Sequence, residues 1–158
     1  MVINRLLEAK FFLNKMEKNE GDVFEFVCYF SAFVSAARSF TWSIRKHMSR
    51  FGGFNSFWDE LVSSKLQKAT ARKFVEIRNF IEKEADNRIS GGTGMQRNGK
   101  FQVKYFFEDD WKKDVLHWCR EYYEILRQIR DIVVKKYKLD DPSSEYYWQD
   151  ILELGSKT

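Results

Sequence analysis

Few residues of this chain could do chemistry, because its 158 residues include only two histidines and two cysteines. His47 and His117 are far apart in the sequence, and neither lies in an H-E-x-x-H or C-x-x-C spacing. His117 and Cys119 are two positions apart on an expected helix, so their side chains point in different directions. We therefore expect no metal site and no cofactor, and we expect Cys28 and Cys119 to serve in packing.

A glycine-rich segment, Gly94 to Lys100, has the G-x4-G-K spacing of a phosphate-binding loop. It is followed by Phe101, where such a loop has the serine or threonine that binds Mg²⁺, and the residues beyond alternate as in a strand. Asn98-Gly99 is instead a strong signal for a two-residue hairpin turn. The sequence therefore predicts a small β-hairpin over residues 87–107 and no phosphate-binding loop.

Basic side chains gather on one face of a helix that we expect over residues 65–85. This face carries, at steps of three and four, Lys65, Lys68, Arg72, Glu76, Asn79 and Lys83. A positive stripe can follow a phosphate backbone, although a solvated surface has the same pattern. Arg78 lies beside the core edge of this helix, where it either contributes to a site or pairs with Glu82 one turn on. The candidate binding residues are Lys65, Lys68, Arg72 and Arg78.

Long stretches without glycine or proline predict the helices that position these residues. We expect a helix over residues 2–18, a second of about 26 residues capped by Asp22, and a short third one capped by Asn55 or Ser56. A fourth helix is expected over 65–85, after a capping box at Ser64 and Gln67. A long helix from Trp111 to beyond Ile132 and a short one from Asp141-Pro142 follow. The second helix has an apolar stripe of Phe26, Phe30, Phe33, Ala37, Phe40 and Ile44. It is expected to be the central core helix.

These patterns predict an all-α fold in a single domain over residues 1–158. The expected architecture is an antiparallel bundle of four main helices, with a short extra helix, a small flanking β-hairpin and a short C-terminal helix. With 44% apolar and 32% charged residues, the chain has material for one core, which excludes disordered and collagen-like proteins.

Location and partners are constrained by the charge distribution. The longest run without a formal charge, residues 26–37, is shorter than the roughly 20 residues of a membrane-spanning helix. The N-terminal residues interleave charged with apolar side chains, unlike a signal peptide. We therefore expect a cytoplasmic protein without a membrane partner. The net charge of +4 allows an anionic partner without requiring one.

Three stretches resemble the HEPN superfamily, in particular its uncharacterised bacterial helical-bundle members. They are FVCYFSAFVSAARSFTWSI, the helix with Phe57-Trp58, and KFVEIRNFIEKE, and the resemblance covers about residues 22–84. It implies a helical bundle that forms a homodimer. Active members are metal-independent RNases in which a ribose 2′-OH attacks the adjacent phosphate, an arginine stabilises the developing charge and a histidine moves protons.

The motif of that superfamily is degenerate in this chain. Arg78-Asn79 matches the first half of R-N-x3-H, but Lys83 stands where the histidine would be. An ordinary lysine stays protonated at neutral pH, whereas a histidine can both give and accept a proton. The resemblance therefore implies a non-catalytic binding or interaction module, with RNA, a nucleotide or a protein of a toxin–antitoxin or phage-defence system as its partner. The alternative is a metal-independent RNase in which Arg78 and Asn79 act with Lys83 or Glu82.

Overall fold

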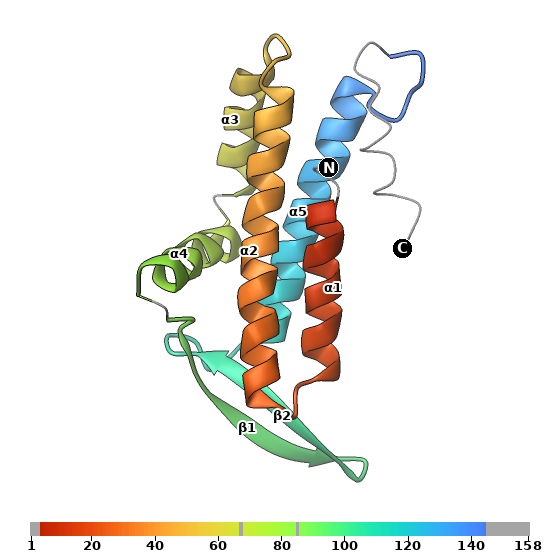
Figure 1. The fold of residues 1–158 in the computed structure, drawn as a ribbon. Coiled ribbons are helices and arrows are strands. Elements are labelled where there is room, and N and C mark those ends of the chain that lie inside the picture. Colours follow the sequence, from red (N-terminus) through yellow and green to blue (C-terminus); the bar gives the residue numbers. More distant parts are fainter. Residues whose placement is uncertain (1–3, 67, 85, 145–158) are drawn as a thin grey trace.

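The structure is a computed structural model that describes residues 4–66, 68–84 and 86–144. The described chain is mostly helical, with one small antiparallel sheet (Figure 1). Its elements, in chain order, are α1 (Asn4–Lys18), α2 (Val23–Met48), α3 (Phe54–Lys65), α4 (Ala69–Glu84), β1 (Ile89–Arg97), β2 (Lys100–Phe107) and α5 (Val115–Tyr137). The predicted helical class and flanking hairpin are confirmed.

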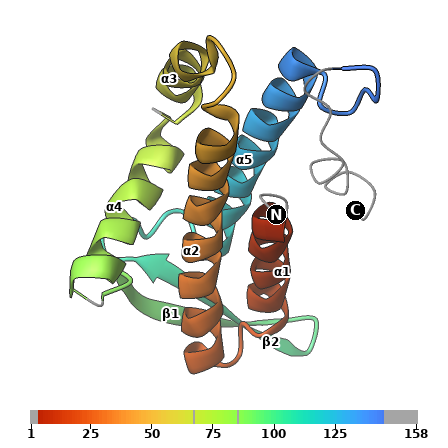
Figure 2. The same cartoon turned by 45° about the horizontal axis from the view of Figure 1, so that its top comes forward.

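Helices α1, α2 and α5 lie side by side with roughly aligned axes (Figure 1). A short turn joins α1 to α2, so the two run in opposite directions, while α5 runs in the same direction as α2. Helix α4 packs obliquely on α2 and α5, and the hairpin crosses the end of the bundle where α2 begins (Figure 2). The hairpin and the turn between α1 and α2 therefore close the same end of the molecule.

The core is built around α2, as its apolar spacing predicts. All six residues of the predicted stripe are buried. At its start, Asp22 Oδ1 accepts the backbone N–H of Glu25 at 3.0 Å, which is the expected cap. Helix α2 is also long and apolar enough to cross a membrane, but the central helix of a packed core can have the same length and composition. Here it supplies nine buried residues to the core.

Stacked aromatic rings join α4 to its neighbours. The Phe74 ring of α4 lies parallel to the Tyr122 ring of α5, with centroids 4.4 Å apart and an interplanar angle of 9°. Phe33 of α2 meets the Phe74 ring edge-on at 6.0 Å. Because these three rings come from three helices, their packing fixes where the outer face of α4 lies.

Two helix starts differ from the prediction. Helix α3 begins at Phe54 after Gly53, whose left-handed φ of 77° ends the preceding turn, so neither Asn55 nor Ser56 is the cap. Helix α4 begins only at Ala69, and Lys65 belongs to the end of α3. The predicted capping box is wrong because Ser64 lies inside α3; its hydroxyl donates to the Leu61 carbonyl.

Helix α5 also starts later than its stripe suggests. Asp114 is its cap, with Oδ1 accepting the His117 backbone N–H at 2.9 Å. Trp111, the expected first member of the stripe, precedes the helix and is 55% exposed. Its ring stacks on Phe106 of β2 with centroids 5.4 Å apart. The predicted helix from Trp111 is therefore wrong at its start, because a contact with the hairpin holds this residue.

The hairpin confirms the predicted turn. Asn98 and Gly99 have φ of 51° and 74°, as a primed two-residue turn requires, so Gly94 to Lys100 is not a phosphate-binding loop. Tyr105 of β2 is buried, and its hydroxyl donates to the Glu20 carbonyl at 2.7 Å. Residues 141–144 form a turn, and the rest of the expected C-terminal helix lies outside the described residues.

The two cysteines have different environments. Cys119 is buried, as expected, and burial raises the pKa of its thiol well above the usual value. Cys28 is exposed, so a packing role for it is wrong. The physical reason is helical geometry: at about 100° per residue, Cys28 points away from the buried Phe26 and Phe30 on either side of it.

Candidate functional site

Arg78 lies on α4 with its side chain partly buried and fixed by its neighbour. Its Nε and Nη2 donate to Asn79 Oδ1 at 3.3 Å and 2.9 Å. The expected pairing of Arg78 with Glu82 is wrong, because Glu82 forms an ion pair with Arg38 of α2 instead. Among the described residues, no carboxylate pairs with Arg78. Its positive charge is thus oriented by a neutral amide and not neutralised by a carboxylate.

The inner side of Arg78 faces the edge of the core, as predicted. It lies close enough to Tyr122 to influence its ionisation electrostatically. Burial raises the pKa of Tyr122 to about 12, although the positive charge of Arg78 acts in the opposite direction. Tyr122 is therefore a neutral phenol at physiological pH, and its ring stacks on that of Phe74.

Lys83, the third residue of the degenerate motif, is placed differently. It is exposed in the last turn of α4. Within the described part of the chain, it makes no hydrogen bond or ion pair with Arg78 or Asn79. The structure therefore joins the first two residues of the motif by hydrogen bonds and leaves the third outside that contact.

The other predicted binding residues do not form one helix face. Lys65 ends α3 and its Nζ donates to Gln128 Oε1 of α5 at 3.4 Å. Lys68 is exposed just before α4 begins, and Arg72 is exposed on its second turn. The break between α3 and α4 separates Lys65 from the stripe, which is a correction to the predicted single face over residues 65–85. Lys68 and Arg72 are four positions apart, and both are exposed near the start of α4.

Acidic residues of α5 limit the positive field near Lys68. A shallow hollow of about 320 Å³ is lined by Lys68, Thr70, Glu121, Glu124, Ile125 and Gln128. Thr70 Oγ1 donates to Glu121 at 3.0 Å, and Lys113 pairs with the same carboxylate at 2.9 Å. This part of the surface has mixed charge, so the side chains best suited to a phosphate are Arg78, Asn79 and Arg72.

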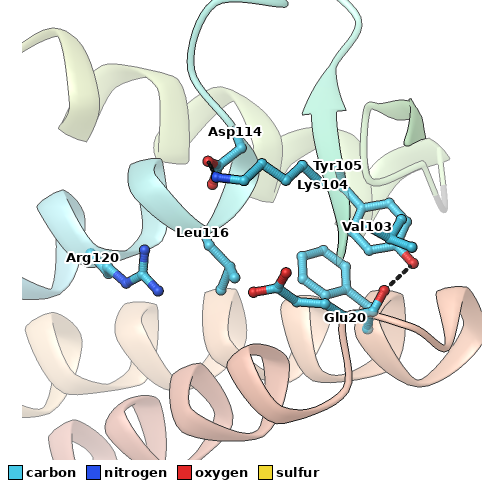
Figure 3. Close-up of a pocket in the computed structure, with 8 residues that line it drawn as sticks. Glu20, Val103, Lys104, Tyr105, Asp114, Leu116 and Arg120 are labelled. Atoms are coloured by element: carbon cyan, nitrogen blue, oxygen red, sulfur yellow. Dashed lines mark hydrogen bonds and ion pairs between the residues drawn. The ribbon is translucent and has the colours of Figure 1, made fainter. Parts of the chain in front are cut away.

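A separate cavity lies at the end of the bundle that the hairpin closes (Figure 3). It has a volume of about 170 Å³ and is formed where the α1–α2 turn, the start of α2, β2 and the first turns of α5 meet. The side chains that line it include Glu20, Phe26, Lys104, Asp114, Leu116 and Arg120. No local sequence pattern indicates this cavity, because its walls combine residues 20 and 26 with residues from 103–105 and 114–120.

Comparison with known proteins found no family model, no curated protein and no solved structure that matches the chain. The described residues contain no group of three or more histidine, cysteine, aspartate or glutamate side chains that could hold a metal ion. The chain has two candidate sites, the Arg78 surface and the cavity beside Glu20.

Proposed function

We propose that this protein is a HEPN-like, non-catalytic binding module that binds RNA through the outer face of α4. The observation that carries this proposal is the state of Arg78. Its guanidinium is oriented by Asn79, and no carboxylate among the described residues neutralises it. An oriented arginine without an anionic partner is suited to a phosphate oxygen.

Neighbouring side chains extend this surface along α4. Arg72 and Lys83 are exposed on the same helix, and Lys68 is exposed just before it. Basic groups spaced along a helix can contact successive phosphates of a nucleic acid strand. On α4 itself, Lys68, Arg72 and Lys73 lie at or just before the start of the helix, while Glu76, Glu82 and Glu84 accompany Arg78 and Lys83 towards its end.

The non-catalytic assignment is supported by the surroundings of the two residues that could replace the missing histidine. Lys83 is exposed and has no described contact with Arg78. Glu82 is already engaged by Arg38. Neither arrangement places a proton-transfer group beside the guanidinium, as RNA cleavage without a metal requires.

Other parts of the proposal concern architecture and setting. We propose that α1, α2, α4 and α5 correspond to the four main helices of an antiparallel HEPN-like bundle. We also propose a cytoplasmic protein that works with a toxin–antitoxin or phage-defence partner. Free thiols at Cys28 and Cys119 are compatible with a reducing compartment.

The test of RNA binding is a fluorescence anisotropy titration of a labelled single-stranded RNA at several salt concentrations. We expect the logarithm of the affinity to fall linearly with the logarithm of salt, with a slope of about 0.7 for each phosphate contacted. Arg78→Ala, and separately Lys68→Glu with Arg72→Glu, should weaken binding and reduce this slope. Lys18→Glu with Lys135→Glu changes the net charge equally on other helices and should have a much smaller effect.

The same preparation separates binding from catalysis. Incubation of the protein with structured and unstructured RNA in EDTA should leave both intact. Cleavage that Arg78→Ala abolishes would support the alternative RNase and overturn the non-catalytic assignment. Absence of RNA binding, or binding that is independent of salt, would contradict the proposed function and leave a protein partner as the ligand of this surface.

A further inference from the structure

The cavity at the hairpin end of the bundle contains one carboxylate without a partner. Glu20 is partly buried in the α1–α2 turn, and its carboxylate points into the cavity between Arg120 and the Lys104–Asp114 pair (Figure 3). Its own backbone carbonyl accepts the Tyr105 hydroxyl, but within the described residues the side chain makes no hydrogen bond or ion pair. The carboxylate keeps contact with water, since no described side-chain oxygen is both buried and unpaired, and it can accept a hydrogen bond from a ligand.

The nearby cations already form ion pairs with other carboxylates. Arg120 Nε lies 2.9 Å from Glu17 Oε1, and Lys104 Nζ lies 3.3 Å from Asp114 Oδ2. Four charged residues line the cavity, Glu20, Asp114, Lys104 and Arg120, and Glu17 pairs with Arg120 from outside it. Together the five groups have a formal charge of −1, which Glu20 carries. A bound anion would add to this charge, whereas a ligand with one positive charge would neutralise it.

Burial also affects the ionisation of Glu20. It raises the pKa of this carboxyl group, while the charges of Lys104 and Arg120 oppose the shift and those of Asp114 and Glu17 add to it. The four flanking groups therefore do not fully compensate the loss of water around Glu20. The remaining cost can be offset by a hydrogen-bond donor that enters the cavity.

The rest of the cavity wall sets the size and shape of such a ligand. Val103 and Leu116 lie in the wall beside the carboxylate, and most of the wall is polar. A volume of about 170 Å³ is below the range of about 300–1,000 Å³ usual for drug-sized ligands. The space suits a molecule of only a few heavy atoms.

We propose that this cavity is a binding site for a small primary ammonium compound, with the ammonium group on the Glu20 carboxylate and a short body beside Val103 and Leu116. This site is independent of the RNA surface on α4. The ligand class follows from the unpaired carboxylate, from the nearby cations that already pair with other carboxylates, and from the small volume of the cavity.

The test uses three probes of the same length, n-butylammonium, 1-butanol and butyrate, titrated into the full chain in phosphate buffer and followed by calorimetry and amide NMR. We expect saturable binding of n-butylammonium, with shifts at the α1–α2 turn and at β2, and no binding of the other two. Glu20→Gln should weaken n-butylammonium by about tenfold or more, as expected for losing a hydrogen bond to a charged group. Val103→Phe, which fills the cavity without changing its charge, should also block binding.

Glu25→Gln is the matched control, because Glu25 is exposed on the first turn of α2 and does not line the cavity. This variant should bind n-butylammonium like the unmodified protein. The proposal is overturned if no saturable binding occurs at millimolar concentration, if 1-butanol or butyrate binds equally well, or if Glu20→Gln binds with unchanged affinity. Circular dichroism of each variant distinguishes a lost site from a lost fold.

Discussion

Lys73 is the most enclosed cation of the described residues that form ion pairs, with a side chain only 11% exposed. Its Nζ lies 2.7 Å from Asp109 Oδ1 and 4.9 Å from the ring centroids of both Phe107 and Trp118. The hydrogen bond from Lys73 is the main cause that lowers the pKa of Asp109. This contact fastens the loop before α5 to the inner part of α4.

We expect Asp109→Asn to lower the free energy of unfolding at pH 7 by about 1 kcal/mol or less, because Asp109 itself is 66% exposed and water screens the pair. The folded pKa of Asp109 lies below its unfolded value, so its contribution is complete above the unfolded pKa and is lost as pH falls through the folded one. Urea denaturation of both proteins should therefore show a difference at pH 7 that disappears in acid.

Asp140→Asn is the control for this pH dependence, since Asp140 is exposed beyond the end of α5. It should leave the free energy of unfolding nearly unchanged at every pH. A difference between the unmodified protein and Asp109→Asn that persists below the folded pKa would contradict an electrostatic origin.

Among individual residues, the pairing of charged side chains was the feature least predictable from the sequence. The sequence suggested Glu82 as the partner of Arg78, since the two are one helical turn apart. In the structure, Arg38 of α2 takes Glu82, and Arg78 turns to Asn79. A contact between two helices competes with the local one, and no spacing rule within a single helix can reveal that competitor.

At the scale of elements, apolar periodicity predicted which faces are buried but not where each helix starts. The stripe of α2 is buried as expected because it depends only on the repeat of 3.6 residues. The starts of α4 and α5 depend on single residues. Trp111 fits the helical repeat before Val115, but its stack on Phe106 lies outside any local pattern. The cavity beside Glu20 was not predicted either, because no local pattern shows which segments meet around it.

Phe74 makes ring contacts from helix α4 to both of its neighbouring helices, which makes the attachment of α4 testable. Phe74 is 2% exposed and contacts rings of both α2 and α5. Phe74→Ala should lower the free energy of unfolding by about 3–5 kcal/mol, through lost burial and the cavity left behind. Chemical denaturation measures this loss, and the RNA titration should show weaker binding because Phe74 holds the helix that carries Arg78 against α2 and α5.

The adjacent Val75→Ala provides a matched comparison on the same helix. Val75 is 42% exposed, so its truncation should change the free energy of unfolding by no more than about 0.5 kcal/mol. Similar losses for the two variants would show that α4 is not fastened by its aromatic contact with α2 and α5.

For the whole molecule, the outward face of α2 is unusual. Phe24 is 74% exposed and Trp42 is 61% exposed, and their separation of 18 positions places both on the same side of the helix. Large exposed apolar side chains often mark a protein interface. We propose that this face forms the homodimer that the HEPN resemblance implies.

Light scattering should then give a solution mass of twice 19.0 kDa for the unmodified chain. Phe24→Glu combined with Trp42→Glu should give a monomer, because burying charged groups in a symmetric interface is costly. Phe11→Glu with Val75→Glu changes two exposed apolar residues elsewhere and should leave the dimer intact. A monomeric unmodified chain at every concentration would contradict the dimer.

The contact between α1 and α5 has a consequence for how the protein is made. Glu17 and Arg120 form an ion pair across 103 positions of sequence, and the helices that carry them pack together. As the chain leaves the ribosome, α1 and α2 can pair early because they are adjacent in sequence. The side of α1 that α5 covers must stay exposed until nearly the whole chain has emerged, so a nascent chain that stalls before α5 should be a substrate for chaperones.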